Sequence, residues 1–243
     1  MKTTNYIGTS GWNYKNWKSD FYPKDLKQSE WLGFYQEHFN TVEVNNSFYQ
    51  LPAKDTLEKW KETVGNSFQF AVKASRYTTH NKKLKDPRES TENFFEAVDH
   101  LGDRLGPVLF QLPPNWRYNG ERLREFLSSL PKGLRYVMEF RDESWINDES
   151  ISFLEEFDVA FCIYNMGNYT TPLHATAGFV YVRLHGPDPR QKYQGEYSPQ
   201  ELSAWADRIT RWNKGRRDVY LYFNNDLGGH AHQNALKLKD YLV

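Results

Sequence analysis

Two acidic side chains occur where apolar strands are expected to end, and their placement suggests acid/base chemistry. In residues 136–145, the alternation of a β-strand puts Glu139 and Arg141 on one face, while the other face is wholly apolar. Residues 41–45 repeat this pattern with Glu43 on the polar face. Burying an unpaired charge is costly, so these residues indicate a site at the strand ends. Two inward carboxylates can share general acid and general base work, as in glycoside hydrolysis, which predicts Glu43 and Glu139 as catalytic residues.

His185 is the third predicted catalytic residue. Residues 180–185 alternate in the same way and place Arg183 and His185 on one polar face. A histidine in this position can act as a general base or as a metal ligand, and the alternative is a hydrogen-bonded structural residue. No His-Glu-x-x-His spacing supports a metal site made of His185, Glu43 and Glu139. No cofactor is therefore predicted, and a divalent metal ion is kept as the alternative.

The basic side chains on these polar faces have two interpretations. Lys73, Arg141 and Arg183 can hold the negative charge of a ligand, or they can pair with Glu43 and Glu139 as a structural ion network. Both interpretations stay open at this point. Under the first, the residues predicted to bind a ligand are Asn45, Lys73, His80, Gln111, Arg141, Trp145, Arg183 and Asn224.

Gly228 and Gly229 precede the last predicted helix and form a further candidate for ligand binding. Backbone N–H groups at a helix N-terminus attract anions. Three basic residues, Arg183, Arg190 and Lys192, lie in or soon after the strand predicted at residues 179–185. Together they resemble the phosphate site of a TIM barrel. The alternative is that the two glycines only form the turn before the helix.

Polar strand ends of this kind need a fold that brings them together. Parallel strands closed into a barrel turn one face to a ring of helices and the other to the barrel axis, and their sites lie at the carboxyl ends of the strands. Strands are predicted at residues 6–10, 41–45, 68–73, 107–112, the start of 136–145, 159–164, 179–185 and 218–224.

Helical stripes separate these predicted strands, except in residues 165–178, where the sixth helix is expected to be short or missing. The pattern predicts an α/β protein with a single (β/α)₈ TIM-like barrel as one domain over residues 1–243. An open, doubly wound sheet is the alternative. It is disfavoured because no glycine-rich phosphate fingerprint follows the first strand.

The composition excludes several classes of protein. The chain has 243 residues, and its 31 Lys and Arg balance 31 Asp and Glu, so no overall charge attracts it to nucleic acid or to an anionic membrane. The single cysteine, Cys162, excludes an internal disulfide and fits a reducing compartment. No signal sequence and no apolar run of membrane-spanning length occurs, which predicts a cytoplasmic protein without a membrane partner.

Short motifs spread along the chain together resemble those of a known family. They are Gly8-Thr9-Ser10-Gly11-Trp12, Phe21-Tyr22-Pro23, Glu43-Val44-Asn45 with Phe48-Tyr49, Thr79-His80, Gln111-Leu112-Pro113-Pro114, Glu139-Phe140-Arg141 with Ser144-Trp145, Arg183-Leu184-His185-Gly186 and Phe223-Asn224-Asn225. In combination they are similar to the YecE-like family, a bacterial domain of unknown function. The resemblance implies a TIM barrel without a defined activity. By structural analogy it also implies a nuclease-like, DNA-binding role as one alternative.

The sequence therefore predicts a hydrolase-type enzyme that acts on a small, polar, anionic ligand containing a phosphate or a sugar. Glu43, Glu139 and His185 would supply the acid/base chemistry, without an organic cofactor. The alternatives are a nucleic-acid-binding or repair-endonuclease-like barrel and a non-catalytic ligand-binding barrel. The neutral net charge counts against strong binding of nucleic acid, which depends on many contacts from Lys and Arg to phosphates.

Overall fold

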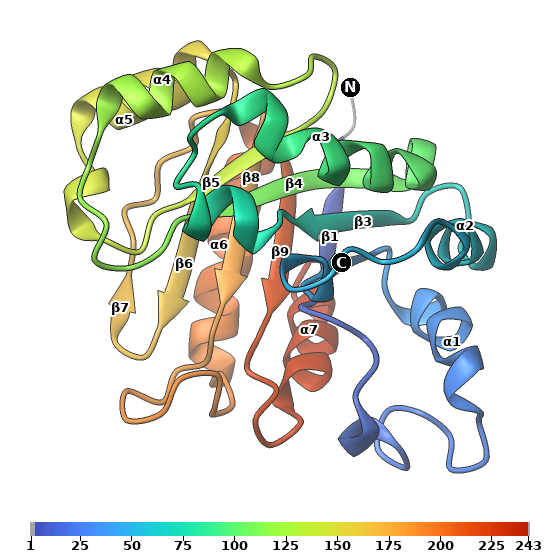
Figure 1. Ribbon diagram of the computed structural model, residues 1–243. Helices are drawn as coiled ribbons and strands as arrows, with labels where there is room; N and C mark the ends of the chain where they lie inside the picture. The colour runs from blue at the N-terminus through green and yellow to red at the C-terminus, as the bar shows by residue number, and fades with distance from the viewer. Residues whose placement is uncertain (1–2, 243) are drawn as a thin grey trace.

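Eight parallel strands form a nearly closed barrel in the computed structural model, which describes residues 3–242 (Figure 1). Neighbouring strands follow the order β1-β9-β8-β6-β5-β4-β3-β2, and a short ninth strand, β7, pairs antiparallel with β6. The eight are β1 (Asn5–Thr9), β2 (Thr41–Val44), β3 (Gln69–Lys73), β4 (Leu105–Gln111), β5 (Tyr136–Glu139), β6 (Ala160–Met166), β8 (Phe179–Leu184) and β9 (Asp218–Phe223). The single TIM-like barrel predicted from the sequence is confirmed.

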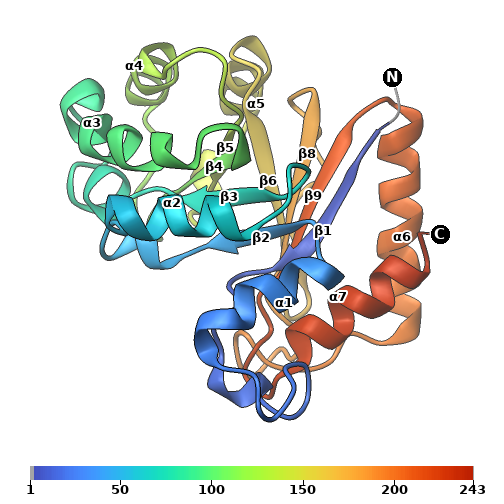
Figure 2. The ribbon, with the colours of Figure 1, turned by 90° about the vertical axis from the view of Figure 1, so that its right-hand side faces the viewer.

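Seven α-helices within residues 3–242 cover the outside of the barrel. They are α1 (Trp31–His38), α2 (Lys54–Thr63), α3 (Pro87–Val98), α4 (Gly120–Ser129), α5 (Asp148–Glu156), α6 (Pro199–Lys214) and α7 (His230–Asp240). Figure 2 shows α6 and α7 beside β9 and β1, with α2 on the side of β2 and β3. No helix in this part of the chain has both the length and the apolar character needed to cross a membrane.

The sixth helix of the barrel is missing, as the sequence predicted. After β6, the chain turns at Gly167 and returns as β7 (Tyr169–Thr170), and an irregular segment then leads to β8. Two threonine side chains hold this segment against the barrel. The Thr171 hydroxyl accepts a hydrogen bond from the backbone N–H of Tyr164 at 3.0 Å, and Thr176 accepts one from Phe161 at 2.8 Å. These bonds satisfy backbone groups that would otherwise be buried without a partner.

The alternation of each strand separates two apolar regions. On the outer face, Met138 of β5 and Val182 of β8 pack against the helices. On the inner face, Val137 and Tyr181 belong to a second cluster inside the barrel, together with Cys162. Burial raises the pKa of the Cys162 thiol well above its ordinary value, so this cysteine is an unreactive core residue. The apolar inner cluster fills the barrel axis below the polar strand ends.

The barrel closes between β1 and β2 through a side chain. Within the described residues, no backbone ladder joins these two strands. The hydroxyl of Tyr35, from α1, accepts a hydrogen bond from the Thr9 N–H at 3.0 Å and donates one to the Thr41 carbonyl at 3.1 Å. Gly8 permits the close approach, because a Cβ at this position would lie 2.3 Å from the carbonyl oxygen of Thr41.

Candidate functional site

Arg183 lies at the centre of a charged cluster at the carboxyl end of the barrel. It projects from β8 to the barrel axis, and its side chain is only 2% exposed. One guanidinium nitrogen, Nη2, lies 2.7 Å from Glu43 Oε1, and the other, Nη1, lies 2.7 Å from Glu139 Oε2. Both carboxylates are completely buried. The structure therefore brings Glu43 and Glu139 together, as predicted, with a guanidinium bridging them.

Both carboxylates are held in the ionised form. Burial alone would raise the pKa of Glu43, but the Arg183 guanidinium and hydrogen bonds from Ser10 and Tyr181, both 2.7 Å, hold it below its ordinary value. Burial likewise opposes ionisation of Glu139, yet Arg141 and Arg183 hold its pKa well below its usual range. Neither carboxyl group carries a proton near neutral pH, so neither is suited to act as a general acid there.

Arg141 connects this ion network to His185. It follows β5, forms an ion pair with Glu139, and stacks 4.4 Å from the centre of the Tyr164 ring. Its Nη2 lies 2.9 Å from His185 Nε2. A guanidinium can only donate hydrogen bonds, so Nε2 accepts, and the proton of the neutral imidazole is on Nδ1. The Asn224 side-chain nitrogen, Nδ2, lies 3.1 Å from this Nδ1, so the tautomer requires the amide to be turned over, with its oxygen accepting the Nδ1 proton.

His185 is completely buried, and its imidazole is neutral. Burial, followed by the nearby Arg183 and Arg141, holds the pKa of His185 well below its ordinary value. Its Nε2 lone pair is engaged by Arg141, so it is free to accept another proton only if Arg141 moves. His185 is therefore a hydrogen-bonded structural residue in this geometry, and it becomes available as a general base when Arg141 moves.

Lys73 stands on the other side of the cluster at the end of β3. Its amine donates a hydrogen bond to Gln111 Oε1 at 2.9 Å and lies 4.1 Å from the centre of the Phe48 ring. Burial, followed by Arg183, lowers the pKa of Lys73 to about 8. Arg183 also approaches Gln111, with 3.4 Å between Nη1 and Oε1. Gln111 is thus a neutral link between the two cations.

His80 and Asn45 lie at the edges of the same cluster. His80 is on a short π-helical turn, η4 (Tyr77–Asn81), where its Nδ1 contacts the Thr79 hydroxyl at 2.9 Å. Burial, and then Lys73, lowers the pKa of His80 to about 4. The Asn45 amide donates to Glu43 Oε1 at 3.0 Å. Both predicted ligand-binding residues are therefore close to the charged groups and partly exposed.

One of the predicted ligand-binding residues, Trp145, has a different role in the structure. Trp145 is completely buried, packs on Phe140 and donates its indole N–H to the backbone carbonyl of Trp116. This correction follows from the aromatic rings of Trp116, Tyr118 and Phe140, which pack around the indole at the end of η6 (Glu143–Trp145). A ligand at the barrel mouth cannot reach this side chain.

Gly228 and Gly229 form the turn before α7, and the phosphate site stays a prediction. Both adopt positive φ values, 101° and 80°, which favour glycine. The neighbouring side chain is Asp226, which accepts a hydrogen bond from the Trp17 indole at 2.6 Å. A carboxylate beside the start of α7 opposes the binding of an anion there. Arg183 is committed to the two glutamates, and Arg190 pairs with Asp188.

Two residues of the cluster were missed in the sequence. Ser10 and Tyr181 both donate hydrogen bonds to Glu43, one to each carboxylate oxygen. Tyr181 precedes Arg183 by two residues and shares its strand face, which is the signal that could have identified it. Ser10 ends the first predicted strand, but only the arrangement of β1 beside β2 places it against Glu43.

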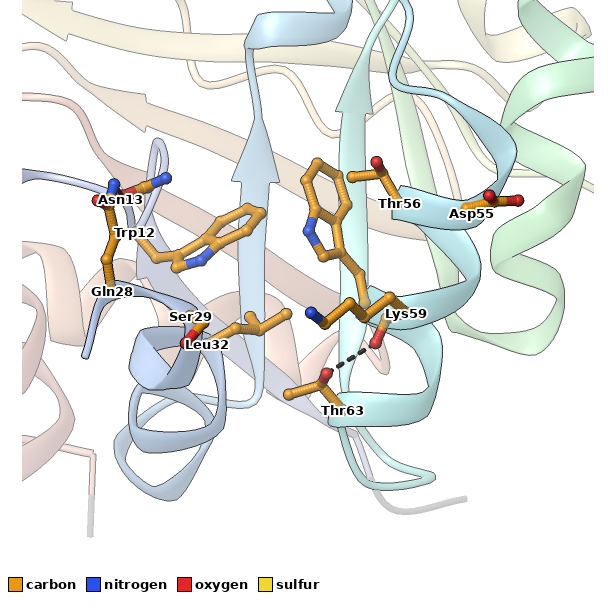
Figure 3. A pocket seen from close by; sticks show the side chains of 10 residues that line it. Trp12, Asn13, Gln28, Ser29, Leu32, Asp55, Thr56, Lys59 and Thr63 are labelled. Atoms are coloured by element: carbon orange, nitrogen blue, oxygen red, sulfur yellow. Dashed lines mark hydrogen bonds between the residues drawn. The ribbon is translucent and has the colours of Figure 1, made fainter. Parts of the chain in front are cut away.

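Two neighbouring cavities lie on the outside of the barrel near this cluster. A cavity of about 550 Å³ opens between α1 and α2, with Trp12 on one wall and Lys59 and Thr56 on the other (Figure 3). A smaller cavity of about 260 Å³ shares Trp12 with it and extends to Ser10 and Asn45. Because both of these residues bond Glu43, the second cavity borders the ion network.

A metal site does not form from the predicted ligands. Across residues 3–242, no group of three or more His, Cys, Asp and Glu side chains is arranged to hold a metal ion. Arg183 lies between Glu43 and Glu139, and Arg141 contacts both Glu139 and His185. These guanidinium groups occupy the space in which a cation would have to bind.

Comparisons with known proteins agree with the motifs found in the sequence. The family model described as "Protein of unknown function DUF72" matches residues 6–243. The UPF0759 protein YunF of Bacillus subtilis (strain 168) is 28% identical, over 98% of this chain and 94% of its own length. The UPF0759 protein YecE of Escherichia coli (strain K12) is 29% identical, over 56% of this chain and 48% of its own length. The resemblance to the YecE-like family is thereby confirmed.

Solved structures support the fold. The crystal structure of a DUF72 family protein (TM1631) from Thermotoga maritima MSB8 matches with a TM-score of 0.89 and 29% identity, covering 98% of this chain and 99% of the other. A D-psicose 3-epimerase from Clostridium cellulolyticum H10 matches with a TM-score of 0.56 and 14% identity, over 100% of this chain and 98% of the other. At this low identity, the second match concerns the barrel alone.

Proposed function

This chain belongs to the DUF72 family, and from the geometry of its own barrel mouth we propose that it is an enzyme acting on a small anionic ligand that carries a phosphate or carboxylate group. The observation that carries the proposal is an excess of positive charge. Three cations, Lys73, Arg141 and Arg183, face two carboxylates, Glu43 and Glu139. Since His185 is neutral, the cluster has a formal charge of +1 that an anionic ligand would balance.

The cations divide into a structural part and a part that can reach a ligand. Arg183 is buried and bonded to both glutamates. Lys73 and Arg141 are partly exposed, and within residues 3–242 the one hydrogen-bond partner of Arg141 Nη1 is the sulfur of Met166, at 4.0 Å. A planar guanidinium with free donors suits a carboxylate or a phosphate. We therefore propose that Arg141 and Lys73 contact the ligand. Arg183 has a structural role, because it is held by the two glutamates.

The proton chemistry in this proposal belongs to His185, with Glu139 as the group that holds Arg141. An anionic ligand that binds Arg141 would draw its Nη2 away from His185 Nε2, which the guanidinium engages at 2.9 Å. The freed imidazole could then accept a proton from water, as a hydrolase requires. Ligand binding and activation of the base are thereby coupled through one side chain.

Thermal unfolding with inorganic phosphate as the probe tests the binding part of the proposal. We expect a saturable increase in Tm for the wild type, because a ligand that binds only the folded state stabilises it. Arg141→Gln should reduce the affinity for phosphate by about tenfold or more, consistent with a charge-assisted hydrogen bond of about 1.5–3 kcal/mol. Lys214→Gln, a change of equal charge at the exposed end of α6, is the control and should bind like the wild type.

An unchanged phosphate affinity in Arg141→Gln would contradict the assignment. For the chemical part, hydrolysis of p-nitrophenyl phosphate and of p-nitrophenyl glycosides should be measured for the wild type and His185→Asn. Turnover by the wild type that His185→Asn lacks is the expected result. Phosphate binding without turnover of any of these compounds would favour the non-catalytic alternative.

A single-stranded nucleic acid is the second candidate ligand, and it has one observation in its favour. Tyr49, Tyr77, Tyr169 and Tyr193 are 80%, 44%, 41% and 38% exposed, and each lies in a segment that follows a barrel strand. Exposed rings around a cationic site can stack on bases, with about 1–3 kcal/mol per base. A shift of labelled single-stranded DNA that weakens steeply with salt would favour this candidate over a small molecule.

A further inference from the structure

Lys73 differs from the other two cations of the cluster in its partners. Arg183 bonds both glutamates, and Arg141 pairs with Glu139. Among residues 3–242, by contrast, no carboxylate lies within ion-pair distance of the Lys73 amine. Its contacts are the neutral oxygen of Gln111 at 2.9 Å and the face of the Phe48 ring, with 4.1 Å to the centroid. An amine without a counter-ion is poorly stabilised as a cation when it is half-buried.

The position of Lys73 is well defined by its backbone. Its carbonyl accepts a hydrogen bond from the Ser47 hydroxyl at 2.7 Å, and the next residue, Ala74, donates its N–H to the Leu109 carbonyl at 2.9 Å. The side chain therefore starts from a fixed point on the inner face of β3 and reaches the barrel mouth, where it is partly exposed. A lysine on a rigid strand end, reachable from solvent, is well placed for covalent chemistry.

The charge state of the amine suits a nucleophile. Burial, and then the cation Arg183, lowers the pKa of Lys73 from 10.5 to about 8. A large fraction of the amine is then unprotonated slightly above neutral pH, whereas an ordinary lysine is almost fully charged. Neighbouring cations and a desolvated surrounding are the established means of activating a lysine.

We propose that Lys73 is a catalytic nucleophile that forms an imine with the carbonyl group of an aldehyde or ketone bearing a phosphate or carboxylate. The lone pair of the neutral amine attacks the carbonyl carbon and gives a carbinolamine. The carbonyl oxygen then leaves as water with the two amine protons, and a C=N bond remains. No oxidant or reductant is needed. The anionic group of the ligand contacts Arg141, so this inference rests on the proposed function for its anion contact.

The groups around Lys73 allow its titration to be observed separately. They are Glu43 on β2, Phe48 on η3 (Asn46–Phe48), His80 on η4, Gln111 on β4, Glu139 and Arg141 at the end of β5, and Arg183 on β8. Both glutamates are ionised above pH 5 and His80 is neutral there, because its pKa is about 4. A change centred near pH 8 therefore belongs to Lys73.

Reductive trapping with glyoxylate, a small anionic aldehyde, tests the inference. The full chain is incubated with glyoxylate and sodium cyanoborohydride, and carboxymethylated lysines are located by mass spectrometry of peptides. At pH 7.5, roughly, we expect Lys73 to react about tenfold or more faster than exposed Lys214, because more of its amine is unprotonated. The rate at Lys73 should rise with pH to a midpoint near 8, the value to which its pKa is lowered.

Lys73→Arg keeps the positive charge and should eliminate the fast modification without affecting that of Lys214. Inorganic phosphate should slow the reaction at Lys73 alone if the anion and the aldehyde share Arg141. A rate at Lys73 no greater than that at Lys214, in protein whose Tm phosphate still raises, would overturn the imine and leave the proposed anion site intact. Loss of both effects would overturn the two proposals together.

Discussion

A guanidinium bonded to two buried carboxylates has large consequences when one partner is removed. In Arg183→Ala, Glu43 and Glu139 stay buried without their bridging cation. In Glu139→Ala, Arg183 loses one of its two partners. We expect each single substitution to lower the free energy of unfolding by about 3–5 kcal/mol. The double variant should lose less than the sum, because the two residues share one interaction. Urea unfolding of the four proteins at one pH measures this.

A different outcome would give the pair another role. If Arg183→Ala or Glu139→Ala unfolds like the wild type but no longer binds phosphate, that residue contacts the ligand directly and is not a structural partner. Lys214→Gln serves as the control for a change of surface charge, because Lys214 is exposed at the end of α6. Its stability should stay within about 0.5 kcal/mol of the wild type.

The lowered pKa of Lys73 makes stability depend on pH in a defined direction. In the unfolded chain the pKa of Lys73 has its ordinary value of 10.5, and in the folded protein it is about 8. Between pH 8 and pH 10.5, the unfolded state therefore binds more protons than the folded state. Stability contributed by this residue therefore rises from pH 8 to 10.5. We expect the stability of Lys73→Met relative to the wild type to be greatest near pH 7 and to decrease toward pH 10. Urea unfolding at several pH values checks this, and a difference that is constant with pH would contradict it.

Individual side chains show where reasoning from sequence succeeded. Strand alternation assigned Glu43, Glu139 and Arg183 to the inner face, because a period of two depends only on local geometry. It could not show that Trp145 is buried, since this depends on the aromatic rings that pack around the indole. It also could not show that Ser10 bonds Glu43, because their strands are adjacent only in the closed barrel.

Between elements, one hydroxyl group bridges the backbones of β1 and β2. Tyr35→Phe would leave the Thr9 N–H and the Thr41 carbonyl without the partner that they share at 3.0 and 3.1 Å. We expect a loss of about 1–3 kcal/mol in the free energy of unfolding, the usual range for leaving buried polar groups unpaired. Tyr241→Phe, at an exposed tyrosine, is the matched control. Equal stability of the two variants would show that the hydroxyl is not needed for closure.

The missing sixth helix shows how an absent pattern can be informative. Residues 165–178 contain no helical stripe, and the structure has a short hairpin and an irregular segment instead. The sequence did not reveal which contacts hold this segment against the barrel in place of a helix. Thr171 and Thr176 bond the backbone of β6, and such contacts have no periodic signature.

For the molecule as a whole, the barrel was predictable and the ion network was predictable only in part. Alternation of strands and helices along the chain, with one exception, is sufficient for the fold. Once the barrel is predicted, the residues at the carboxyl ends of its strands are known from the sequence. Which cation bonds which carboxylate depends on strand tilt and on the reach of each side chain, so Arg183 could not be distinguished from Arg141 or Lys73 beforehand.

The missing ladder between β1 and β2 has a consequence for local opening. Each of these strands has hydrogen-bonded neighbours on one side only, whereas β5 and β8 have them on both. Amide protons should therefore exchange with solvent deuterium fastest, among the barrel strands, in β1 and β2. Glu43 lies on β2 and Ser10 directly follows β1, and the Ser10 hydroxyl donates a hydrogen bond of 2.7 Å to Glu43 Oε1 between these two strands. The part of the barrel that opens most readily is thus the part that carries one wall of the charged cluster.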